Sequence, residues 1–284
     1  MTVAAFVTRF APSPTGALHL GHVFSALTAF DAARAAGGRF LLRIEDIDAS
    51  RCRPAHEAAA MDDLAWLGLE WETPVRRQSA HLADYRAAID RLRAEGLLYR
   101  CFRTRREVAR QIASAPHGPP ARSAGGRLSA AEESRRLATG ENFAWRLDLE
   151  AARRRLGGFD RLAFVEAGAG PRGESGATIA DPTAAGDVVL GRKGVGVAYH
   201  LAVVVDDALQ GVTQVIRGND LFDSVPIQRL LQALLGLPTP IYRHHRLLAG
   251  ADGKRLAKRD GAQSLAALRA DGVTAADARA RVGL

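Results

Sequence analysis

Arg9-Phe-Ala-Pro-Ser-Pro-Thr-Gly-Ala-Leu-His-Leu-Gly-His22 is the stretch of the chain that decides its fold. It joins a short apolar segment, Val3–Phe10, to a segment with helical spacing of apolar residues that begins at Leu18. Gly37-Gly38 ends this helix, and a second strand-like segment follows at Phe40–Ile44. The N-terminal region therefore predicts a strand–turn–helix–strand unit with parallel strands and a right-handed crossover.

Beyond this unit, strand-like and helix-like segments continue to alternate. The predicted helices are Pro54–Leu67, His81–Glu95 and Leu221–Leu235. The predicted strands are Phe143–Leu149, Arg161–Val165, Asp187–Leu190, Tyr199–Val205 and Val212–Ile216. The run Leu201–Val205 is apolar throughout, which favours a central parallel strand covered on both faces. The predicted fold class is α/β, with a doubly wound parallel sheet of the Rossmann-like, nucleotide-binding type.

The middle of the chain differs in composition from both ends. Capping-box patterns at Thr104–Glu107 and Ser129–Glu132 predict two helices. Ser114–Gly126 and Gly168–Gly176 are rich in glycine and proline and are predicted as loops. We therefore expect four parts: residues 1–100 as the first half of the Rossmann-like domain, 101–185 as an α+β insertion, 186–260 as the second half, and 261–284 as a short helical tail.

The composition indicates a cytoplasmic protein. The chain has 284 residues, 47% of them hydrophobic, which is enough for a sizeable core, and no run of about 18 apolar residues that would predict a membrane span. Its first residues lack the basic start and apolar stretch of a signal peptide. Two cysteines, Cys52 and Cys101, provide no disulfide framework and fit a reducing compartment. We expect no membrane partner and a monomer.

The net charge permits two interpretations. The formal charge is +8 and the isoelectric point is about 10.2. A basic protein suits a polyanionic partner such as nucleic acid, because neutralising phosphates releases counterions. A genome rich in G and C, which favours arginine and alanine codons, explains the same charge without any partner.

The turn before the first helix is suited to bind phosphate. A helix N-terminus at this position offers unpaired N–H groups and the positive end of the helix dipole. Gly16 and Gly21 allow a ligand to approach the backbone closely. His19 and His22 are three residues apart, so both can face one phosphate. Two such histidines are usually structural, but the whole string in this location favours a nucleotide site.

A second basic motif, Gly253-Lys-Arg-Leu-Ala-Lys-Arg259, follows the turn at Ala251-Asp252. A lysine-rich loop can close over a nucleotide and neutralise the charge that develops on a leaving pyrophosphate. Alone, such a segment is most often a solvated basic turn. Together with the phosphate-binding turn it indicates a nucleotide-dependent enzyme.

Both motifs resemble the two signatures of class I aminoacyl-tRNA synthetases. The segments Arg9–Gly16 and Arg43–Asp48 resemble the glutamyl branch of that family, as do Tyr199–Asp207 and Val215–Leu221. The resemblance extends from about residue 6 to about residue 260. Only some 25 residues follow the basic loop, so we expect no anticodon-binding domain.

The resemblance implies a function. Members of this branch are ATP-dependent ligases that form glutamyl-adenylate from L-glutamate and ATP with Mg²⁺. For so short a chain the resemblance implies activation without tRNA, followed by transfer of glutamate to the queuosine base of tRNA(Asp). Two alternatives stay open: a truncated synthetase that charges a tRNA 3′ end, and a non-catalytic relative that binds tRNA or nucleotide.

The resemblance also assigns residues to the substrates. Glu45 would hold the ammonium of glutamate, and Arg217 and Tyr199 would contact the same ligand; an arginine fork suits a carboxylate. The implied glutamate site comprises Arg9, Phe10, Ala11, Pro12, Ser13, Glu45, Tyr199 and Arg217. The implied ATP site comprises Gly16, His19, Gly21, His22 and Lys258, of which His19, His22 and Lys258 would also be catalytic.

The chain departs from the family pattern in two places. Many relatives open a zinc site with Cys-x-Cys, whereas this chain has Cys101-Phe-Arg103 and no further cysteine or tyrosine in Ser114–Gly126. We therefore expect no structural zinc, and Cys101 as a small buried residue. In the basic loop, Arg255 stands for a lysine and Ala257 for a serine; one lost hydrogen bond costs about 1 kcal/mol, so activity can be reduced without vanishing.

Other charged clusters carry weaker signals. Asp206-Asp207 could be a metal pair, but on the predicted strand the two side chains would point to opposite faces, which argues against a shared ion. Arg103–Arg106 and Arg153–Arg155 are most simply solvated helix faces, with contact to tRNA phosphate as the alternative.

Overall fold

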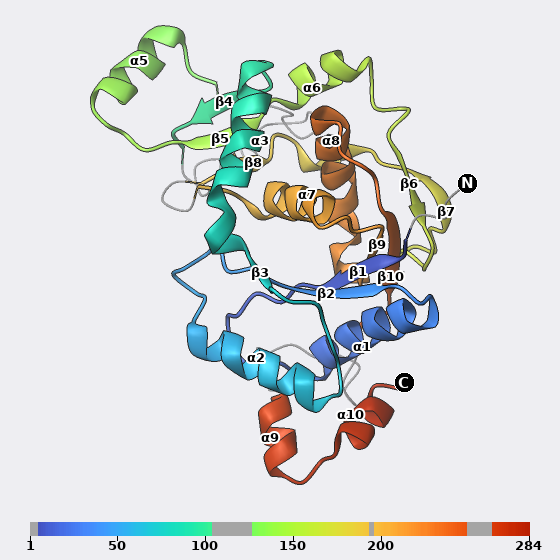
Figure 1. The fold of residues 1–284 in the computed structure, drawn as a ribbon. Helices are drawn as coiled ribbons and strands as arrows, with labels where there is room; N and C mark the ends of the chain where they lie inside the picture. The colour runs from blue at the N-terminus through green and yellow to red at the C-terminus, as the bar shows by residue number, and fades with distance from the viewer. Residues whose placement is uncertain (1–4, 104–126, 193–195, 249–262) are drawn as a thin grey trace.

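A layer of mainly parallel strands runs through the middle of the molecule, with helices on both faces (Figure 1). The computed structural model describes residues 5–103, 127–192, 196–248 and 263–284. One face carries the helices α1 (Leu20–Ala35) and α2 (Pro54–Trp66), and the other carries α3 (Leu82–Ala94), α7 (Tyr199–Leu209) and α8 (Val225–Leu235). The predicted doubly wound α/β fold class is confirmed.

The N-terminal unit has the predicted order of strand, helix and parallel strand. Strands β1 (Val7–Phe10) and β2 (Arg39–Ile44) pair in parallel, with Val7 opposite Arg39. Helix α1 between them gives way to a turn at Gly37, whose φ of +58° is readily adopted only by a residue without a Cβ atom. On its other side β2 pairs with the short edge strand β3 (Arg76–Arg77).

The sheet continues with a strand from the far end of the chain. The Thr213 N–H donates to the Val7 carbonyl, and the Val7 N–H donates to Thr213 Oγ1, both at 2.9 Å. These bonds place β9 (Gln214–Gly218) beside β1. Strand β10 (Ile241–His245) then pairs in parallel with β9. Strands from both ends of the chain thus lie side by side and in parallel, as in the doubly wound folds that bind nucleotides.

The outer edge of this sheet comes from the middle of the chain. Strand β6 (Ala163–Glu166) pairs in parallel with β10, and β7 (Gly176–Ile179) pairs antiparallel with β6. The segment between β6 and β7 has no regular structure, as the glycines of Gly168–Gly176 predict. Strand β6 lies within residues 101–185, so part of the segment expected as an insertion extends the main sheet.

A second, antiparallel sheet lies beside α3 and α7 (Figure 1). Its strands are β4 (Leu98–Cys101), β5 (Ala144–Leu147) and β8 (Val189–Gly191). Two short helices accompany it: α5 (Ala130–Ala138) and α6 (Leu149–Leu156). Ser129 Oγ accepts a hydrogen bond from the Glu132 N–H at 3.3 Å, which confirms the predicted start of α5. The Thr104–Glu107 helix and the Ser114–Gly126 loop lie outside the described residues.

The strand predicted at Phe143–Leu149 is too long. Strand β5 ends at Leu147, and Asp148 begins helix α6, because its Oδ1 accepts a hydrogen bond from the Ala151 N–H at 2.8 Å. An aspartate at this position satisfies a helix-start N–H that a continuing strand would leave unpaired. The chain therefore changes from strand to helix within two residues.

The strand predicted at Tyr199–Val205 is wrong. These residues form the first turns of α7, which is buried against α3 and α8. A helix covered on several sides is apolar all round, so the run Leu201–Val205 lacks the spacing that marks a surface helix. Its valines favour a strand by local propensity, and tertiary packing overrides that preference.

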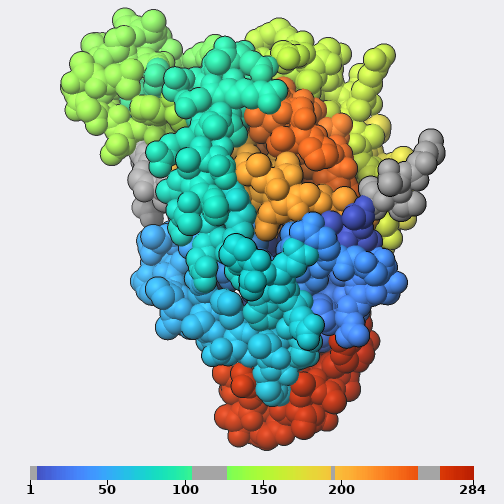
Figure 2. Space-filling model, in the orientation of Figure 1, coloured from blue at the N-terminus to red at the C-terminus, as the bar shows by residue number. Residues whose placement is uncertain are grey.

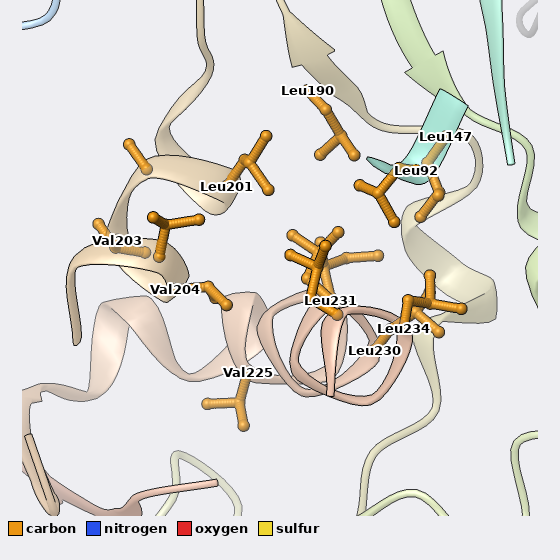
Figure 3. Packing of buried hydrophobic residues seen from close by; sticks show 14 of the residues in the cluster. Leu92, Leu147, Leu190, Leu201, Val203, Val204, Val225, Leu230, Leu231 and Leu234 are labelled. Carbon is orange, nitrogen blue, oxygen red and sulfur yellow. The ribbon is translucent and has the colours of Figure 1, made fainter. Parts of the chain in front are cut away.

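The main core joins α7 and α8 to the antiparallel sheet. Figure 3 shows side chains from these elements and from α3 packed together: Leu92, Leu147, Leu190, Leu201, Val203, Val204, Val225, Leu230, Leu231 and Leu234. A second cluster packs α1 against β2 and the C-terminal helices. Within the described ranges, no helix combines the length and the apolar composition needed to cross a bilayer.

The C-terminal helices α9 (Leu265–Ala270) and α10 (Ala275–Arg281) cover the base of the N-terminal unit, below α1 and α2 in Figures 1 and 2. Arg279 pairs with Asp31 of α1 at 2.6 Å, and Arg269 pairs with Asp63 of α2 at 2.8 Å. Among the described residues there are also three short 3₁₀ helices: η1 (Gln78–His81), η2 (Pro182–Ala185) and η3 (Asn219–Ser224).

Candidate active site

A cavity of about 390 Å³ lies where the parallel strands end. Its lining includes Phe10 at the end of β1, Glu45 just after β2, Gly218 at the end of β9 and His245 at the end of β10. In doubly wound folds, ligands bind at this carboxyl edge of the sheet. The cavity is therefore the first candidate for an active site.

The turn between β1 and α1 forms one wall of the cavity. The carbonyl of Pro12 accepts a hydrogen bond from the Glu45 N–H at 3.0 Å, and the carbonyl of Ser13 accepts one from the Thr15 N–H at 2.8 Å. These bonds fix the turn against the end of β2. Gly21, in the first turn of α1, also lines the cavity, whereas Gly16 belongs to the turn but not to the lining.

His19 and His22 cap helix α1 reciprocally. Nδ1 of His19 accepts a hydrogen bond from the Gly21 N–H at 3.1 Å, and Nδ1 of His22 accepts one from the His19 N–H at 3.2 Å. The two ring centroids are 3.9 Å apart. Because each Nδ1 is an acceptor, a neutral ring carries its proton on Nε2. Both rings line the cavity and can donate from Nε2 while Nδ1 holds the helix start.

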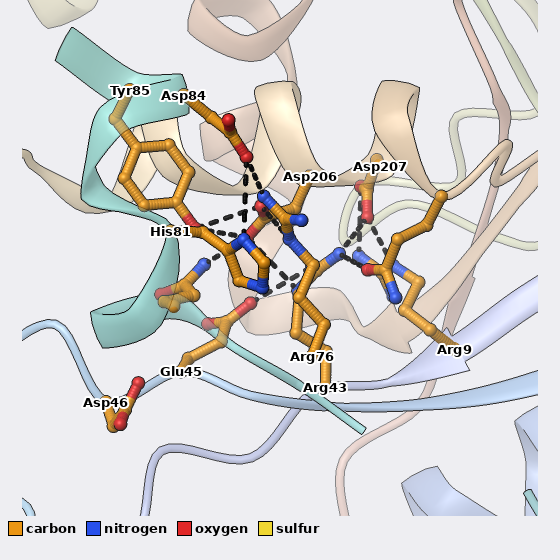
Figure 4. Close-up of polar contacts among 12 residues, drawn as sticks. Arg9, Arg43, Glu45, Asp46, Arg76, His81, Asp84, Tyr85, Asp206 and Asp207 are labelled. Carbon is orange, nitrogen blue, oxygen red and sulfur yellow. Dashed lines mark hydrogen bonds and ion pairs between the residues drawn. The ribbon is translucent and has the colours of Figure 1, made fainter. Parts of the chain in front are cut away.

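A buried network of charged side chains adjoins the cavity (Figure 4). Asp207 on α7 accepts hydrogen bonds from Arg9 Nε at 2.9 Å and from Arg43 Nη1 at 2.7 Å. Arg43, whose side chain is fully buried, also donates to Glu45 Oε1 at 3.1 Å. The network therefore orients Arg9 and Glu45, the two members that line the cavity.

Asp206, the residue before Asp207 on α7, extends this network. It accepts hydrogen bonds from Arg76 Nε at 2.7 Å, from Gln78 Nε2 at 2.8 Å and from the Tyr85 hydroxyl at 2.9 Å. Three arginines face three carboxylates whose side chains are at most 10% exposed: Arg9, Arg43, Arg76, Glu45, Asp206 and Asp207. Arg76 also pairs with the more exposed Asp84 at 2.6 Å. Burial of so many charges is tolerable only with such pairing.

The two carboxylates nearest the cavity differ in their electrostatics. Burial raises the pKa of Glu45, and the charges of Arg43 and Arg9 oppose this only in part. Burial acts on Asp207 in the same direction, but Arg9 and Arg43 outweigh it and lower the pKa of Asp207. Asp207 is thus the firm counter-ion of both arginines, whereas Glu45 has capacity for one more cation.

Arg217 and Tyr199 line the cavity from β9 and α7. Arg217 uses two of its nitrogens within the protein: Nε donates to His244 Nε2 and Nη2 donates to the Leu221 carbonyl, each at 3.1 Å. Its Nη1 donates no hydrogen bond to any residue in the described part of the chain. Burial raises the pKa of the Tyr199 hydroxyl, although the charge of Arg217 lowers it, so the hydroxyl is a neutral donor.

The structure brings together the residues expected around glutamate and most of those expected around ATP. The lining contains Arg9, Phe10, Ala11, Pro12, Ser13, Glu45, Tyr199, Arg217, His19, Gly21 and His22. Lys258 and the whole basic loop lie outside the described residues. Arg9, Glu45 and Arg217, which lie far apart in sequence, line this one cavity.

Several residues of this region were not predicted. Asp206 and Asp207 were expected on a strand with opposite directions, but both lie on helix α7 and bind arginines of β1, β2 and β3. In the sequence, the only sign of their role is that two adjacent aspartates follow an apolar run. That sign indicates a shared role for the two carboxylates only if the run forms a helix. The lining also includes Thr15, Asp220, His245, Arg246, Leu247 and Leu248.

Cys101 is buried on β4, as expected for a small core residue. In the ranges that the structure describes, no three histidine, cysteine or acidic side chains are grouped so that they could hold a metal ion. Residues 104–126, which contain His117, are not among those ranges. The absence of zinc therefore stays a prediction.

The fold and the cavity together define a class of protein. Residues 5–277 match the family described as tRNA synthetases class I (E and Q), catalytic domain, and the chain belongs to this family. Two solved structures are similar at 27% identity, each over 90% of this chain: a glutamate tRNA ligase from Elizabethkingia meningosepticum in complex with its amino acid (TM-score 0.72) and the glutamate-tRNA synthetase of Elizabethkingia anophelis (TM-score 0.74). The match covers 52% and 53% of those longer chains, so this chain spans about half their length.

Within the family, the chain is similar over nearly its full length to glutamyl-Q tRNA(Asp) synthetases. It is 49% identical to that of Rhodobacter capsulatus, with 98% of this chain and 100% of the relative covered. It is 45% identical to that of Symbiobacterium thermophilum (94% and 82% covered) and 48% identical to that of Nocardia farcinica (91% and 77% covered). The resemblance to the glutamyl branch is confirmed.

Proposed function

We propose that this chain is an ATP-dependent ligase that activates L-glutamate as glutamyl-adenylate without tRNA and transfers the glutamyl group to the queuosine base of tRNA(Asp). One observation carries the proposal: Arg9, Glu45, Arg217 and Tyr199 line the same cavity as the helix start at His19. The similarity to glutamyl-Q tRNA(Asp) synthetases supports the choice of acceptor.

Glutamate has two carboxylates and one ammonium, and the cavity offers a partner for each. Arg217 presents Nη1 to a carboxylate, and Arg9 retains Nη1 after its Nε and Nη2 bind Asp207. Glu45 receives the ammonium, because its buried carboxylate gains from an added positive charge. Tyr199 donates its hydroxyl to the same ligand, and Phe10, Ala11, Pro12 and Ser13 shape the floor.

ATP binds at the start of α1. The α-carboxylate of glutamate attacks the α-phosphorus in line, and pyrophosphate leaves with Mg²⁺. His19 and His22 donate from Nε2 to the phosphates, while Gly16 and Gly21 allow the backbone to approach them. Lys258 neutralises the leaving pyrophosphate. The protein contributes position and charge, not a covalent nucleophile.

We assign residues 1–100 and 186–260 to the catalytic domain, together with strands β6 and β7, which pair with β10 and with each other. The rest of residues 101–185 is an insertion that faces tRNA, and residues 261–284 are a helical tail. A monomer with no structural zinc is sufficient for this function. In the second step, a hydroxyl of the modified base attacks the carbonyl carbon of the mixed anhydride and gives up its proton to solvent; an ester forms as the acyl–phosphate bond breaks and AMP leaves.

The test is a two-part assay. Purified protein with ATP, Mg²⁺ and glutamate should exchange labelled pyrophosphate into ATP without tRNA. Labelled glutamate should then appear only on queuosine-containing tRNA(Asp). Label on a 3′ end would favour the truncated synthetase instead, and a lack of exchange would favour a non-catalytic binding protein.

Replacing His19 by asparagine should separate the structural from the catalytic role of this residue. Asparagine is among the best helix N-caps, so we expect the free energy of unfolding to stay within about 0.5 kcal/mol. It lacks the Nε2 donor, so pyrophosphate exchange should fall by roughly 10²–10³-fold. Exchange at the wild-type rate would remove His19 from phosphate binding, and His19→Ala, which also loses the cap, is the control.

Glutamate affinity should depend on pH through Glu45. Burial raises the pKa of this carboxyl, and the substrate ammonium binds only its ionised form. Affinity should therefore be highest above the raised pKa and should fall as pH falls through it. Calorimetric titration between about pH 4 and pH 7 measures this dependence. Glu45→Gln should bind weakly and keep only the pH dependence that comes from the side-chain carboxyl of the substrate, whose pKa is about 4.3. A variant that kept the wild-type profile would contradict the role.

A further inference from the structure

Three buried residues on neighbouring strands form a chain of hydrogen bonds that ends in the cavity. Glu166 ends β6, His244 lies on β10 and Arg217 lies on β9, with His244 directly opposite Arg217 in the parallel register. Glu166 Oε2 is 2.6 Å from His244 Nδ1, and Arg217 Nε donates to His244 Nε2 at 3.1 Å. Glu166, His244 and Arg217 are 1%, 3% and 6% exposed, so little water competes for these bonds.

The chemistry of the three groups determines which atom carries the proton in each of these two hydrogen bonds. A guanidinium has only donors, so His244 Nε2 must accept from Arg217 and carries no proton. A neutral imidazole then has its proton on Nδ1 and donates it to Glu166 Oε2. Burial lowers the pKa of His244, and the charge of Arg217 lowers it further, which keeps the ring neutral although a carboxylate is its partner.

Glu166 is held in place by backbone groups as well as by His244. Its Oε1 accepts from the N–H groups of Gly168 and His244, both at 2.8 Å. A Cβ atom at Gly168 would lie 2.3 Å from the His244 carbonyl, so the backbone after β6 can approach β10 this closely only at a glycine. The carboxylate is thus fixed from three directions.

The aromatic surroundings restrict the orientation further. The rings of Tyr242 and His244 are parallel within 2°, and the Arg217 guanidinium lies 5.4 Å from the Tyr242 ring centroid. Phe222 meets the His244 ring edge-on at 5.1 Å. The imidazole cannot turn without breaking these contacts, so its Nε2 has one direction, toward Arg217.

We propose that Glu166 and His244 are positioning residues that hold Arg217 in the orientation in which its Nη1 meets a carboxylate of the substrate. This inference rests on the proposed function, because it assumes that Arg217 contacts glutamate. The carboxylate of Glu166 orients the imidazole of His244, and the imidazole orients the guanidinium of Arg217. In this proposal only the guanidinium contacts the substrate. Selectivity for a dicarboxylic amino acid then depends on a carboxylate on β6, outside the cavity lining.

Replacing Glu166 by glutamine tests the proposal with almost no change of shape. Oε1 of the amide must still accept the two backbone N–H groups, so its NH₂ faces His244 Nδ1. His244 must then accept at Nδ1 and move its proton to Nε2, where it meets the Arg217 donor. The KM for glutamate should rise about 10- to 100-fold while the KM for ATP stays unchanged.

Two variants of His244 distinguish the effect of its hydrogen bond to Arg217 from the effect of its packing. Glutamine reaches the position of Nε2 and can accept from Arg217, whereas asparagine reaches only the position of Nδ1. His244→Gln should therefore keep a lower KM for glutamate than His244→Asn. Equal KM values for glutamate in both variants would contradict the proposal that His244 positions Arg217.

The control is Asp187→Asn, at a buried carboxylate that binds the Tyr99 hydroxyl (2.8 Å) and the Leu149 N–H (3.0 Å) away from the cavity. It should lower stability and leave the KM for glutamate unchanged. The ¹⁵N shifts of labelled histidine should report a proton on Nδ1 of His244 in the wild type and on Nε2 in Glu166→Gln. If the wild type exchanges pyrophosphate but Glu166→Gln keeps the wild-type KM and the wild-type His244 tautomer, Glu166 and His244 do not position Arg217. If the wild type shows no glutamate-dependent exchange, the proposed function fails. The histidine shifts alone then still decide the proton positions.

Discussion

Arg217→Ala should abolish most glutamate activation and leave ATP binding nearly intact. The side chain is buried, and its proposed partner is a carboxylate that would lose both its counter-charge and its hydrogen bond. Removing one partner from such a buried pair costs about 2–5 kcal/mol, equivalent to a loss of affinity of roughly 30- to several thousand-fold. Glutamate-dependent pyrophosphate exchange gives the KM for glutamate, and equilibrium titration gives the affinity for ATP.

Arg229→Ala is the matched control for this prediction. Arg229 also donates to a backbone carbonyl, that of Ala163, at 2.8 Å, but it is not part of the cavity lining. Its removal should change neither KM by more than about two-fold, because the partly buried Arg229 side chain lies outside the cavity lining. If Arg217→Ala weakened ATP and glutamate equally, a general collapse of the cavity would explain the result better than a lost carboxylate contact.

Asp207→Asn should be the most destabilising single exchange in the charged network. It removes the charge that Arg9 and Arg43 share and leaves two buried guanidinium groups without their main counter-ion. Breaking a buried pair in this way costs about 3–5 kcal/mol. Urea unfolding at neutral pH should report this loss as a lower midpoint with an unchanged slope. A loss below about 1 kcal/mol would show that the network contributes little to stability.

The contribution of Asp207 to stability should depend on pH, in a direction that follows from its lowered pKa. Arg9 and Arg43 outweigh burial and lower the pKa of Asp207 in the folded protein. Its contribution is therefore fully present above the pKa of an unfolded aspartate, about 4, and is lost as pH falls below that value through the folded pKa. The difference in unfolding free energy between wild type and Asp207→Asn should narrow over the same interval.

The exposed pair of Arg39 and Glu72 provides the comparison. Its two hydrogen bonds are both 2.6 Å long, yet the side chains are 52% and 46% exposed. Water screens such a pair, so Glu72→Gln should cost no more than about 1 kcal/mol. The contrast between the two variants would separate the effect of burial from that of hydrogen-bond geometry.

Local sequence patterns predicted the N-terminal part of the fold well. Apolar residues before Pro12, helical spacing after Leu18 and the break at Gly37-Gly38 are short-range signals, and β1, α1 and β2 form where these signals place them. Helix α2 was predicted within one residue at each end, because Pro54 suits the first turn of a helix. Such elements depend little on distant contacts.

Helix α7 could not be predicted in this way. Its residues Leu201–Val205 are buried between two layers of the fold, so every side of the helix is apolar and the pattern resembles that of a central strand. The error had a consequence for the site. On a helix, Asp206 and Asp207 reach arginines of the sheet, whereas on a strand they had been expected to diverge.

The sequence by itself indicated the class of the protein and the turn expected to bind phosphate, because both have signals in short motifs. The resemblance of those motifs to the glutamyl branch supplied the side chains proposed to bind glutamate. Only the tertiary structure decided which groups hold those side chains, because Asp207 and His244 meet Arg9 and Arg217 through pairings between distant strands and helices. Hydrogen bonds and buried charges act over a few ångströms in space, and the chain must fold before residues far apart in sequence come within that range.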